Sequence, residues 1–263
     1  MNISISRVKL FKACRRAYWL HYVQGLEPVQ RTDALQSGLS YHDKMKELYQ
    51  TDKIDVSGHT KEDAMITAYR EKIYPLFQMR VVEEWFEYPL GRDRLVGRLD
   101  GIADDGLLVE HKTTSSPIGE DYEYGLQWDE QILCYMLATG ARQMWYTVCR
   151  RPTLRQKANE TPEEYYKRMV DWYDDDTPSK IRLLQIERTD EEVEAFRQSL
   201  MATVFQMKAF ESEESFYRNP LYCMTWGRRC EYSPICLSYD PHADYIEFTK
   251  QERMNRDYAD QEN

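Results

Sequence analysis

The stretch GRLDGIADDGLLVEHKTT, residues 97–114, decides the fold of this chain. Its apolar residues form two short runs separated by Asp104-Asp105-Gly106, which predicts two antiparallel strands joined by a tight turn. The preceding run VVEEWFEYPL, residues 81–90, is also typical of a strand. Together these runs predict a three-stranded antiparallel meander from about residue 80 to residue 113.

The length of the second turn determines which side chains face each other. A three-residue loop, with its glycine at positive φ, pairs Ala103 with Leu107 and brings Asp100 opposite Glu110. A two-residue turn would place Asp100 on the other face of the sheet. Glu110 and Lys112 are two residues apart in one strand and therefore share a face. With the longer loop, we expect Asp100, Glu110 and Lys112 to lie together.

Two carboxylates at adjacent strand positions repel each other unless a cation lies between them. Oxygen ligands with no neighbouring cysteine favour a hard ion, Mg²⁺ or Mn²⁺. Such an ion can polarise a phosphodiester and lower the pKa of a bound water, and Lys112 could orient that water or neutralise the transition state. The alternative is a solvated ion pair on the surface. However, Leu107, Leu108 and Val109 lead directly into Glu110 and indicate a buried strand, in which unpaired charges are costly.

The rest of the chain alternates between helical and strand patterns, which indicates the α/β class. Helices are expected over residues 4–23, 33–50, 60–78 and 122–139, and strands over 144–150 and 181–188. Capping boxes at Thr161-Pro162-Glu163-Glu164 and Thr189-Asp190-Glu191-Glu192 open two further helices, the second ending near residue 211. We expect one domain over residues 1–263, with a polar helical insert at 152–180 and a charged tail at 250–263.

Composition limits the class of protein. The 263 residues are 42% hydrophobic, which supports a packed core and excludes a wholly disordered chain. No apolar run is long enough to span a bilayer, and the N-terminus has no secretory signal pattern, so we expect a cytoplasmic protein without a membrane partner. The net charge of −10 argues against a general coat for nucleic acid. Local clusters of cations still offer candidate DNA contacts, namely Arg15, Arg16, Arg150, Arg151 and Arg228.

Six cysteines are expected in a reducing compartment, where disulfides are rare. Three of them, Cys223, Cys230 and Cys236, lie in a short stretch with Pro, Gly and aromatic residues, and Cys14 is the fourth candidate. Four thiolates in one place require a metal, either tetrahedral Zn²⁺ or an iron–sulfur cluster. The remaining two, Cys134 and Cys149, are interpreted as core residues.

Two further motifs accompany the acidic strand pair. Gly38-x3-His42 falls on the second expected helix, and Gln131-x3-Tyr135 falls on the helix after the meander, with both side chains on one face. In this order the motifs resemble the PD-(D/E)XK nuclease superfamily, specifically its RecB-like branch. The resemblance implies a restriction-endonuclease-like α/β core, with a mixed central sheet flanked by helices. It also implies a metal-dependent DNA nuclease, here an exonuclease acting on DNA ends or single strands.

The resemblance also assigns roles to residues. His42, Asp100, Glu110 and the main-chain carbonyl of His111 would bind the metal. Lys112 would be the catalytic lysine, and Gln131 and Tyr135 would line the site and touch DNA or the ligands of the metal. Glu83 or Glu84, on the first strand of the meander, is a candidate for a further carboxylate.

One N-terminal and three C-terminal cysteines are similar to the layout of iron–sulfur RecB-like nucleases, which include AddB-type nuclease domains and CRISPR spacer-acquisition exonucleases. The resemblance implies a structural [4Fe–4S] cluster on Cys14, Cys223, Cys230 and Cys236 that joins the two ends of the chain. Six residues separate Cys223 from Cys230, whereas those groups commonly have two, so Zn²⁺ stays as the alternative.

Expected partners are DNA and a helicase, recombinase or other protein subunit, in a prokaryotic cell or a phage-infected host. Two alternatives of another class remain. One is a catalytically idle or partner-activated DNA-binding subunit, and the other is a zinc-stabilised binding protein whose acidic strand pair is coincidental.

Overall fold

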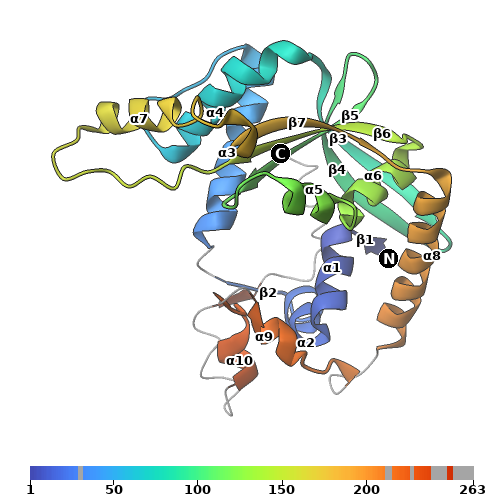
Figure 1. Ribbon diagram of the computed structural model, residues 1–263. Helices are drawn as coiled ribbons and strands as arrows, with labels where there is room; N and C mark the ends of the chain where they lie inside the picture. The colour runs from blue at the N-terminus through green and yellow to red at the C-terminus, as the bar shows by residue number, and fades with distance from the viewer. Residues whose placement is uncertain (29–31, 211–214, 226–227, 238–247, 251–263) are drawn as a thin grey trace. The chain divides into compact units, whose positions relative to one another are not determined.

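The computed structural model describes residues 1–28, 32–210, 215–225, 228–237 and 248–250 (Figure 1). The chain divides into two compact units. The first unit comprises Met1–Arg31, Glu87–Gly97 and Glu194–Asn263, and the second comprises Thr32–Phe86 and Arg98–Val193. The charged tail expected at 250–263 lies, beyond Lys250, outside the described residues. Within the described residues, no helix has both the length and the apolar character needed to cross a membrane.

The second unit is built on a mixed β-sheet. Its strands are β3 (Met79–Leu90), β4 (Asp93–Ala103), β5 (Leu108–Thr114), β6 (Gln143–Arg150) and β7 (Ile181–Glu187), of which β3 and β4 continue into the first unit. The neighbours run β3-β4-β5-β6-β7. The β4–β5 and β6–β7 pairs are antiparallel, and the β5–β6 pair is parallel. Because a parallel pair needs a crossover, the chain between β5 and β6 carries helices.

The loop between β4 and β5 has the predicted three residues. The Ala103 N–H donates to the Leu107 carbonyl at 2.8 Å, and Gly106 has φ 86°. Gly101 pairs with Val109, which confirms the expected register. Beyond that pair the regular ladder stops.

The helices of the second unit are α3 (Asp33–Thr51), α4 (Lys61–Lys72), α5 (Glu120–Leu126), α6 (Glu130–Thr139) and α7 (Pro162–Asp171), with short 3₁₀ turns at Tyr74–Leu76 and Thr177–Ser179. The helix expected over 60–78, with its end near Pro75, ends at Lys72, and Pro75 lies in the separate 3₁₀ turn. The prediction of one helix over 122–139 is wrong. Asp129 caps a new helix by accepting a hydrogen bond from the Gln131 N–H, so the chain forms α5 and α6 instead.

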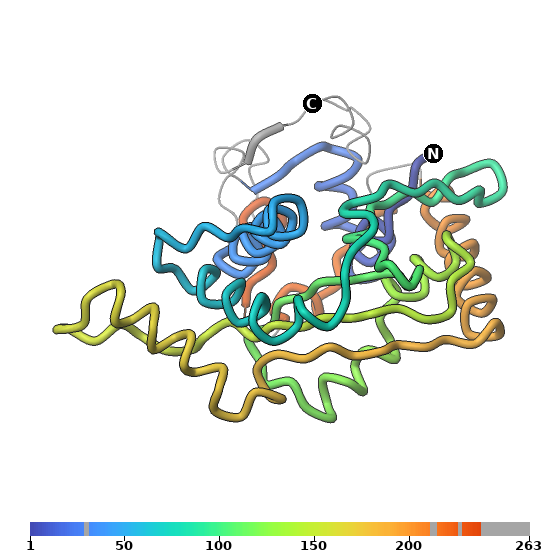
Figure 2. The backbone as a smooth tube through the Cα atoms, turned by 90° about the horizontal axis from the view of Figure 1, so that it is seen from above, coloured from blue at the N-terminus to red at the C-terminus, as the bar shows by residue number. Residues whose placement is uncertain are grey.

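The polar insert contains the predicted capping box, since Thr161 and Glu164 bind each other's backbone N–H at the start of α7. This helix packs beside α4, where the hydroxyls of Thr67 and Tyr166 are 2.7 Å apart. The segment between β6 and β7, yellow in Figure 2, extends away from the strands.

Helices cover both faces of this sheet. On one face Leu108 and Tyr146 pack with Tyr135 and Met136 of α6. On the other face Cys149 and Ile181 pack with residues of α3 and α4. Cys134 and Cys149 are buried, as predicted for core residues. The mixed sheet between helices confirms the expected fold class.

The first unit contains the following helices and strands: β1 (Asn2–Ile3), α1 (Ile5–Ala13), α2 (Arg15–Tyr18), a π-helical turn (Trp19–Val23), β2 (Leu26–Pro28), most of α8 (Asp190–Ala209), α9 (Pro220–Cys223), β8 (Met224–Thr225), β9 (Arg228–Arg229), α10 (Ser233–Leu237) and β10 (Phe248–Lys250).

Three features of these elements bear on the sequence predictions. Ser4 caps α1 as expected, but the single helix predicted over 4–23 is wrong, because Cys14 adopts an extended backbone that separates α1 from α2. The capping box at Thr189 opens α8 as predicted, with the Glu192 N–H donating to Thr189 Oγ1. Strand β1 joins the main sheet, parallel to the start of β4. The two short sheets of this unit are the antiparallel pairs β2–β10 and β8–β9.

Candidate active site

Strand β5 carries Glu110 into the interior of the second unit. Leu108, Val109, Glu110 and His111 are each 3% exposed or less. The Glu110 carboxylate forms an ion pair with the ammonium of Lys112, yet neither of its oxygens accepts a well-formed hydrogen bond. A solvated surface pair, the alternative reading of the sequence, is therefore wrong.

Asp100 lies where the β4–β5 ladder ends. Its Oδ2 accepts a hydrogen bond from the His111 N–H at 2.8 Å, in place of a backbone partner. Burial raises the pKa of Asp100. Burial also raises the pKa of Glu110, and the charge of Asp100 raises it further, so the two carboxylates lie close enough to repel each other. A cation between them would relieve both effects.

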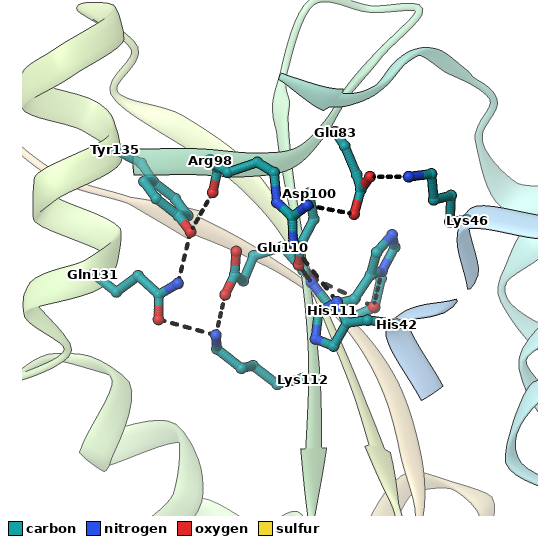
Figure 3. Close-up of polar contacts among 11 residues, drawn as sticks. His42, Lys46, Glu83, Arg98, Asp100, Glu110, His111, Lys112, Gln131 and Tyr135 are labelled. Atoms are coloured by element: carbon teal, nitrogen blue, oxygen red, sulfur yellow. Dashed lines mark hydrogen bonds and ion pairs between the residues drawn. The ribbon is translucent and has the colours of Figure 1, made fainter. Parts of the chain in front are cut away.

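The Lys112 ammonium is held in place by a residue of α6. Its Nζ donates to Gln131 Oε1 at 2.9 Å, and Gln131 Nε2 donates to the Tyr135 hydroxyl at 2.6 Å (Figure 3). The Tyr135 hydroxyl donates in turn to the Arg98 carbonyl at 3.0 Å. Burial alone would lower the pKa of Lys112, but Glu110 and Asp100 outweigh it and the pKa is raised. Lys112 is therefore a fixed, protonated cation next to the two carboxylates.

The Gly38-x3-His42 motif lies on α3. His42 Nδ1 is 3.6 Å from Asp100 Oδ1, and burial lowers the pKa of His42. A Cβ on Gly38 would meet Thr113 Oγ1 at 3.8 Å, an ordinary contact. The histidine thus joins the carboxylates, whereas nothing in the local packing requires the glycine.

The His111 side chain points to the face of the sheet opposite Glu110, following strand alternation. Its Nδ1 is 2.6 Å from Thr147 Oγ1, and its ring stacks on Tyr49 and meets Tyr69 edge-on. Burial lowers the pKa of His111 and keeps the ring neutral. No sequence motif singles out Thr147 or Tyr49, since both look like ordinary core positions. They fix the backbone segment whose carbonyl is the candidate ligand.

The donors present fit a hard divalent cation. Asp100 and Glu110 offer carboxylate oxygens and His42 an imidazole nitrogen. Apart from the ion pair with Lys112, the buried oxygens of Glu110 accept no well-formed hydrogen bond. Among the residues that the structure describes, no three side chains of His, Cys, Asp or Glu are arranged as a ready-made metal site.

A family model decides the relationship of this chain to known proteins. The model described as PD-(D/E)XK nuclease superfamily matches residues 2–78 and 59–237, which together span most of the sequence. The chain belongs to the PD-(D/E)XK nuclease superfamily. Members of this superfamily generally use divalent metal ions such as Mg²⁺ or Mn²⁺. No curated protein matches the sequence significantly.

Several solved structures resemble this PD-(D/E)XK chain at low similarity. SSO0001 is 14% identical with a TM-score of 0.42, over 89% of this chain and 85% of that one. A phage-related exonuclease from Haemophilus somnus 129PT is 14% identical with a TM-score of 0.35, over 73% and 93%. An alkaline exonuclease from Laribacter hongkongensis is 13% identical with a TM-score of 0.34, over 79% and 93%. Likenesses this weak say nothing about function, so the assignment rests on the family model.

The four cysteines singled out in this PD-(D/E)XK chain line one pocket of the first unit. Cys14, Cys223, Cys230 and Cys236 face a pocket of about 470 Å³. Burial raises the pKa of Cys230 to about 11, and burial raises that of Cys236 too. These two thiols are therefore protonated in the absence of a metal, and a metal would displace their protons.

The cationic candidates of this PD-(D/E)XK chain differ in their surroundings. Arg15 and Arg16 lie over the rings of Phe11 and Trp19. Arg228 is exposed on β9.

At the end of β6, Arg150 lies over Trp172, and Arg151 forms an ion pair with Glu62 at 3.0 Å. The Arg150 Nε also donates to the Ser115 carbonyl at 3.4 Å. Ser115 follows the strand that carries Lys112 by one residue. The Arg151 N–H donates to the carbonyl of Thr114, the last residue of that strand, at 2.8 Å. Arg150 and Arg151 thus both contact the end of the strand that carries Glu110 and Lys112.

Proposed function

We propose that this chain is a metal-dependent deoxyribonuclease that hydrolyses phosphodiester bonds at DNA ends or in single strands. One observation carries the proposal: a fully buried Glu110, without hydrogen bonds to its oxygens, lies beside Asp100 and Lys112. Such a cluster costs stability and has no structural purpose of its own. Membership in the nuclease superfamily supports the reaction class.

In this proposal Asp100, Glu110, His42 and the His111 carbonyl hold one or two Mg²⁺ or Mn²⁺ ions. When bound, the ion polarises the phosphodiester and makes a water a better nucleophile. Water adds to phosphorus, the ester bond to the leaving oxygen breaks, and that oxygen takes a proton. Lys112 stabilises the extra negative charge of the transition state, because Gln131 and Glu110 hold its ammonium in place.

In this proposal the DNA backbone contacts arginine side chains of the chain. Arg150 and Arg151, at the end of β6, are the candidates in the second unit, and Arg15, Arg16 and Arg228 are those in the first. Arginine is suited to phosphate because its planar guanidinium can donate two parallel hydrogen bonds.

The cysteine pocket is proposed to hold a [4Fe–4S] cluster, with Zn²⁺ as the alternative. The chemistry of four thiols on one pocket supports a soft metal centre. The centre would stabilise the fold of the first unit rather than take part in hydrolysis. Visible absorption separates the two options, since an iron–sulfur protein is brown and a zinc protein is colourless.

A nuclease assay tests the proposed function directly. Anaerobically purified protein is incubated with end-labelled linear single- and double-stranded DNA in Mg²⁺, Mn²⁺ or EDTA. We expect cleavage with either ion and none in EDTA. Lys112→Ala should reduce cleavage by about 10²-fold or more while it leaves DNA binding nearly intact, because it removes a charge that acts in the transition state.

Lys53→Ala is the matched control, since Lys53 is an exposed lysine of the same unit. It should cleave DNA like the wild type. Full activity in Lys112→Ala would refute the assigned centre. A folded, DNA-binding wild-type protein without cleavage would instead favour an idle or partner-activated subunit.

A further inference from the structure

Glu83 has a backbone conformation that is unusual for a strand. Its φ is 54°, in the left-handed region, although it lies within β3. The other described non-glycine residues with positive φ lie outside strands, at Asp52, His59 and Asp176. A left-handed residue within a strand is strained, and such strain is concentrated at functional sites, where it redirects a side chain.

The strained backbone places the Glu83 carboxylate between two cations (Figure 3). Its Oε2 is 2.6 Å from Lys46 Nζ on α3, and its Oε1 is 3.2 Å from an Arg98 guanidinium nitrogen on β4. The Lys46 and Arg98 side chains are 44% and 45% exposed. Ion pairs this exposed contribute little to stability, so stability does not explain why the strain is tolerated.

The three charges lie beside the candidate metal ligands. Glu83 and Lys46 line the same small pocket as His42, Asp100 and His111. Lys46 follows His42 by one helical turn, and Arg98 precedes Asp100 by two residues in one strand. Both cations therefore project from the elements that supply candidate ligands, and on the same side of each element as the ligand.

Two half-exposed cations around one anion form a site for a phosphate. Guanidinium and ammonium groups bind phosphate oxygens through charge-assisted hydrogen bonds, and a carboxylate has the same sign of charge and similar acceptor atoms. Arg98 also lies over the ring of Trp85, 5.8 Å from its centroid, which limits the freedom of its guanidinium.

On the basis of the proposed nuclease function, we propose that Lys46 and Arg98 form a phosphate-binding subsite for the DNA backbone next to the cleaved bond. Glu83 occupies this subsite as an internal anion and must give way when DNA binds. The subsite makes DNA binding a competition between a backbone phosphate and a carboxylate of the protein itself. It follows that the cations and the carboxylate have opposite effects on DNA affinity.

The test measures DNA binding without catalysis. Fluorescence anisotropy follows a labelled single-stranded oligonucleotide in EDTA, which prevents cleavage and removes metal ions as partners, over a series of salt concentrations. Lys46→Gln and Arg98→Gln should each weaken binding about tenfold, the size expected for losing a hydrogen bond to a charged group. Each should also reduce the slope of log affinity against log salt by about 0.7, the contribution of one phosphate contact to binding of a single strand.

Glu83→Gln should act in the opposite direction. It removes the competing charge while it keeps the shape of the side chain, so DNA should bind several-fold more tightly. In the double variant Glu83→Gln with Arg98→Gln, affinity should fall below that of Glu83→Gln alone. Thermal unfolding of each variant verifies that it is folded.

A second glutamate–arginine pair between β3 and β4 provides the matched control. Glu87 and Arg94 are 3.0 Å apart, with 44% and 65% of their side chains exposed, and they lie in the first unit. Glu87→Gln and Arg94→Gln should leave both affinity and salt slope unchanged. They separate a specific subsite from a general effect of charge.

Several results would overturn the proposal. Unchanged affinity in Arg98→Gln or Lys46→Gln would do so, as would an equal effect in the control pair or a wild-type protein that does not bind the oligonucleotide at low salt. If Glu83→Gln weakens Mn²⁺ binding in calorimetry and does not tighten DNA binding, Glu83 is a metal ligand instead. Failure here leaves the nuclease centre standing, because that centre is tested by loss of cleavage in Lys112→Ala.

Discussion

At the scale of single residues, the site depends on charges that the fold places where they are costly. Glu110 is 2% exposed, and apart from its ion pair with Lys112 its oxygens accept no well-formed hydrogen bond. Burial and the charge of Asp100 both raise the pKa of Glu110, so the two carboxylates repel each other. Removing one partner of a buried ion pair leaves a buried charge uncompensated and lowers stability by about 3–5 kcal/mol. Lys112 offsets part of this cost, and a divalent cation would offset the rest.

Gly101 of β4, the residue after Asp100, has no side chain, and this allows β3 to approach β4 closely at this point. A Cβ at this position would lie 2.7 Å from the Val81 carbonyl oxygen and 2.0 Å from the end of the Met79 side chain. The methionine can move, but the backbone oxygen cannot without shifting β3. We expect Gly101→Ala to lower the free energy of unfolding by about 1–3 kcal/mol, as overpacking does, in urea denaturation.

Gly125→Ala is the control for this substitution. Gly125 lies in α5, and a Cβ there would meet nothing within 4 Å. Alanine restricts the unfolded chain and favours the helix, so stability should be unchanged or higher by up to about 1 kcal/mol. Equal losses in both variants would contradict the steric role of Gly101.

The core of the candidate site could be predicted from the sequence because a local signal fixes it. A three-residue loop with one glycine sets the register, and the register brings Asp100 to Glu110. The contacts of Glu83 with Lys46 and Arg98 could not be predicted in this way. They depend on a positive φ within a strand, for which glutamate gives no signal, and on the packing of α3 against the sheet.

At the scale of elements, β5 places functional side chains on both faces of the sheet. Alternation sends Glu110 and Lys112 toward α6 and the His111 ring toward Tyr49 and Tyr69. Periodicity predicts this alternation, and it also predicts the existence of most helices. It could not locate the break between α5 and α6, because the side-chain cap at Asp129 interrupts a pattern that stays apolar at helical spacing.

The helix of the insert should depend on pH through one ion pair. Arg168 Nε and Nη2 donate to the two carboxylate oxygens of Glu160, at 2.6 and 2.7 Å. These hydrogen bonds lower the pKa of Glu160 to about 2. A lowered pKa contributes stability that is complete above the ordinary value of 4.5 and is lost as pH falls through about 2. Hydrogen exchange, corrected for intrinsic rates, should show the amides of α7 losing protection over this window.

Arg168→Gln tests the cause of that loss. The variant should have less protection in α7 at neutral pH and a flatter response between pH 4.5 and 2, because its Glu160 has no charged partner. If α7 of the variant loses protection over the same window and by the same amount as the wild type, another group is responsible.

At the scale of the whole molecule, the two proposed metal centres belong to different compact units. The carboxylates and Lys112 lie in the second unit, and the cysteine pocket lies in the first. Sequence spacing could associate Cys14 with the distant Cys223–Cys236 stretch only through a family resemblance. The structure brings them to one pocket because α9 and α10 fold beside the start of α2.

Since each centre draws its ligands from one unit, each should be removable without the other. Cys230→Ala takes one of four ligands from the pocket, and metal ligation contributes folding free energy. We expect this variant to lose the visible absorption of an iron–sulfur protein, or its bound zinc, and to lose hydrogen-exchange protection in the first unit. Calorimetric Mn²⁺ binding at the centre proposed on Asp100 and Glu110 should be retained. Cys134→Ala, in the core of the second unit, should keep the metal of the pocket while it loses core packing. If the Cys230→Ala protein keeps its metal and its hydrogen-exchange protection, the proposed four-cysteine centre is wrong, and the proposed nuclease centre is unaffected.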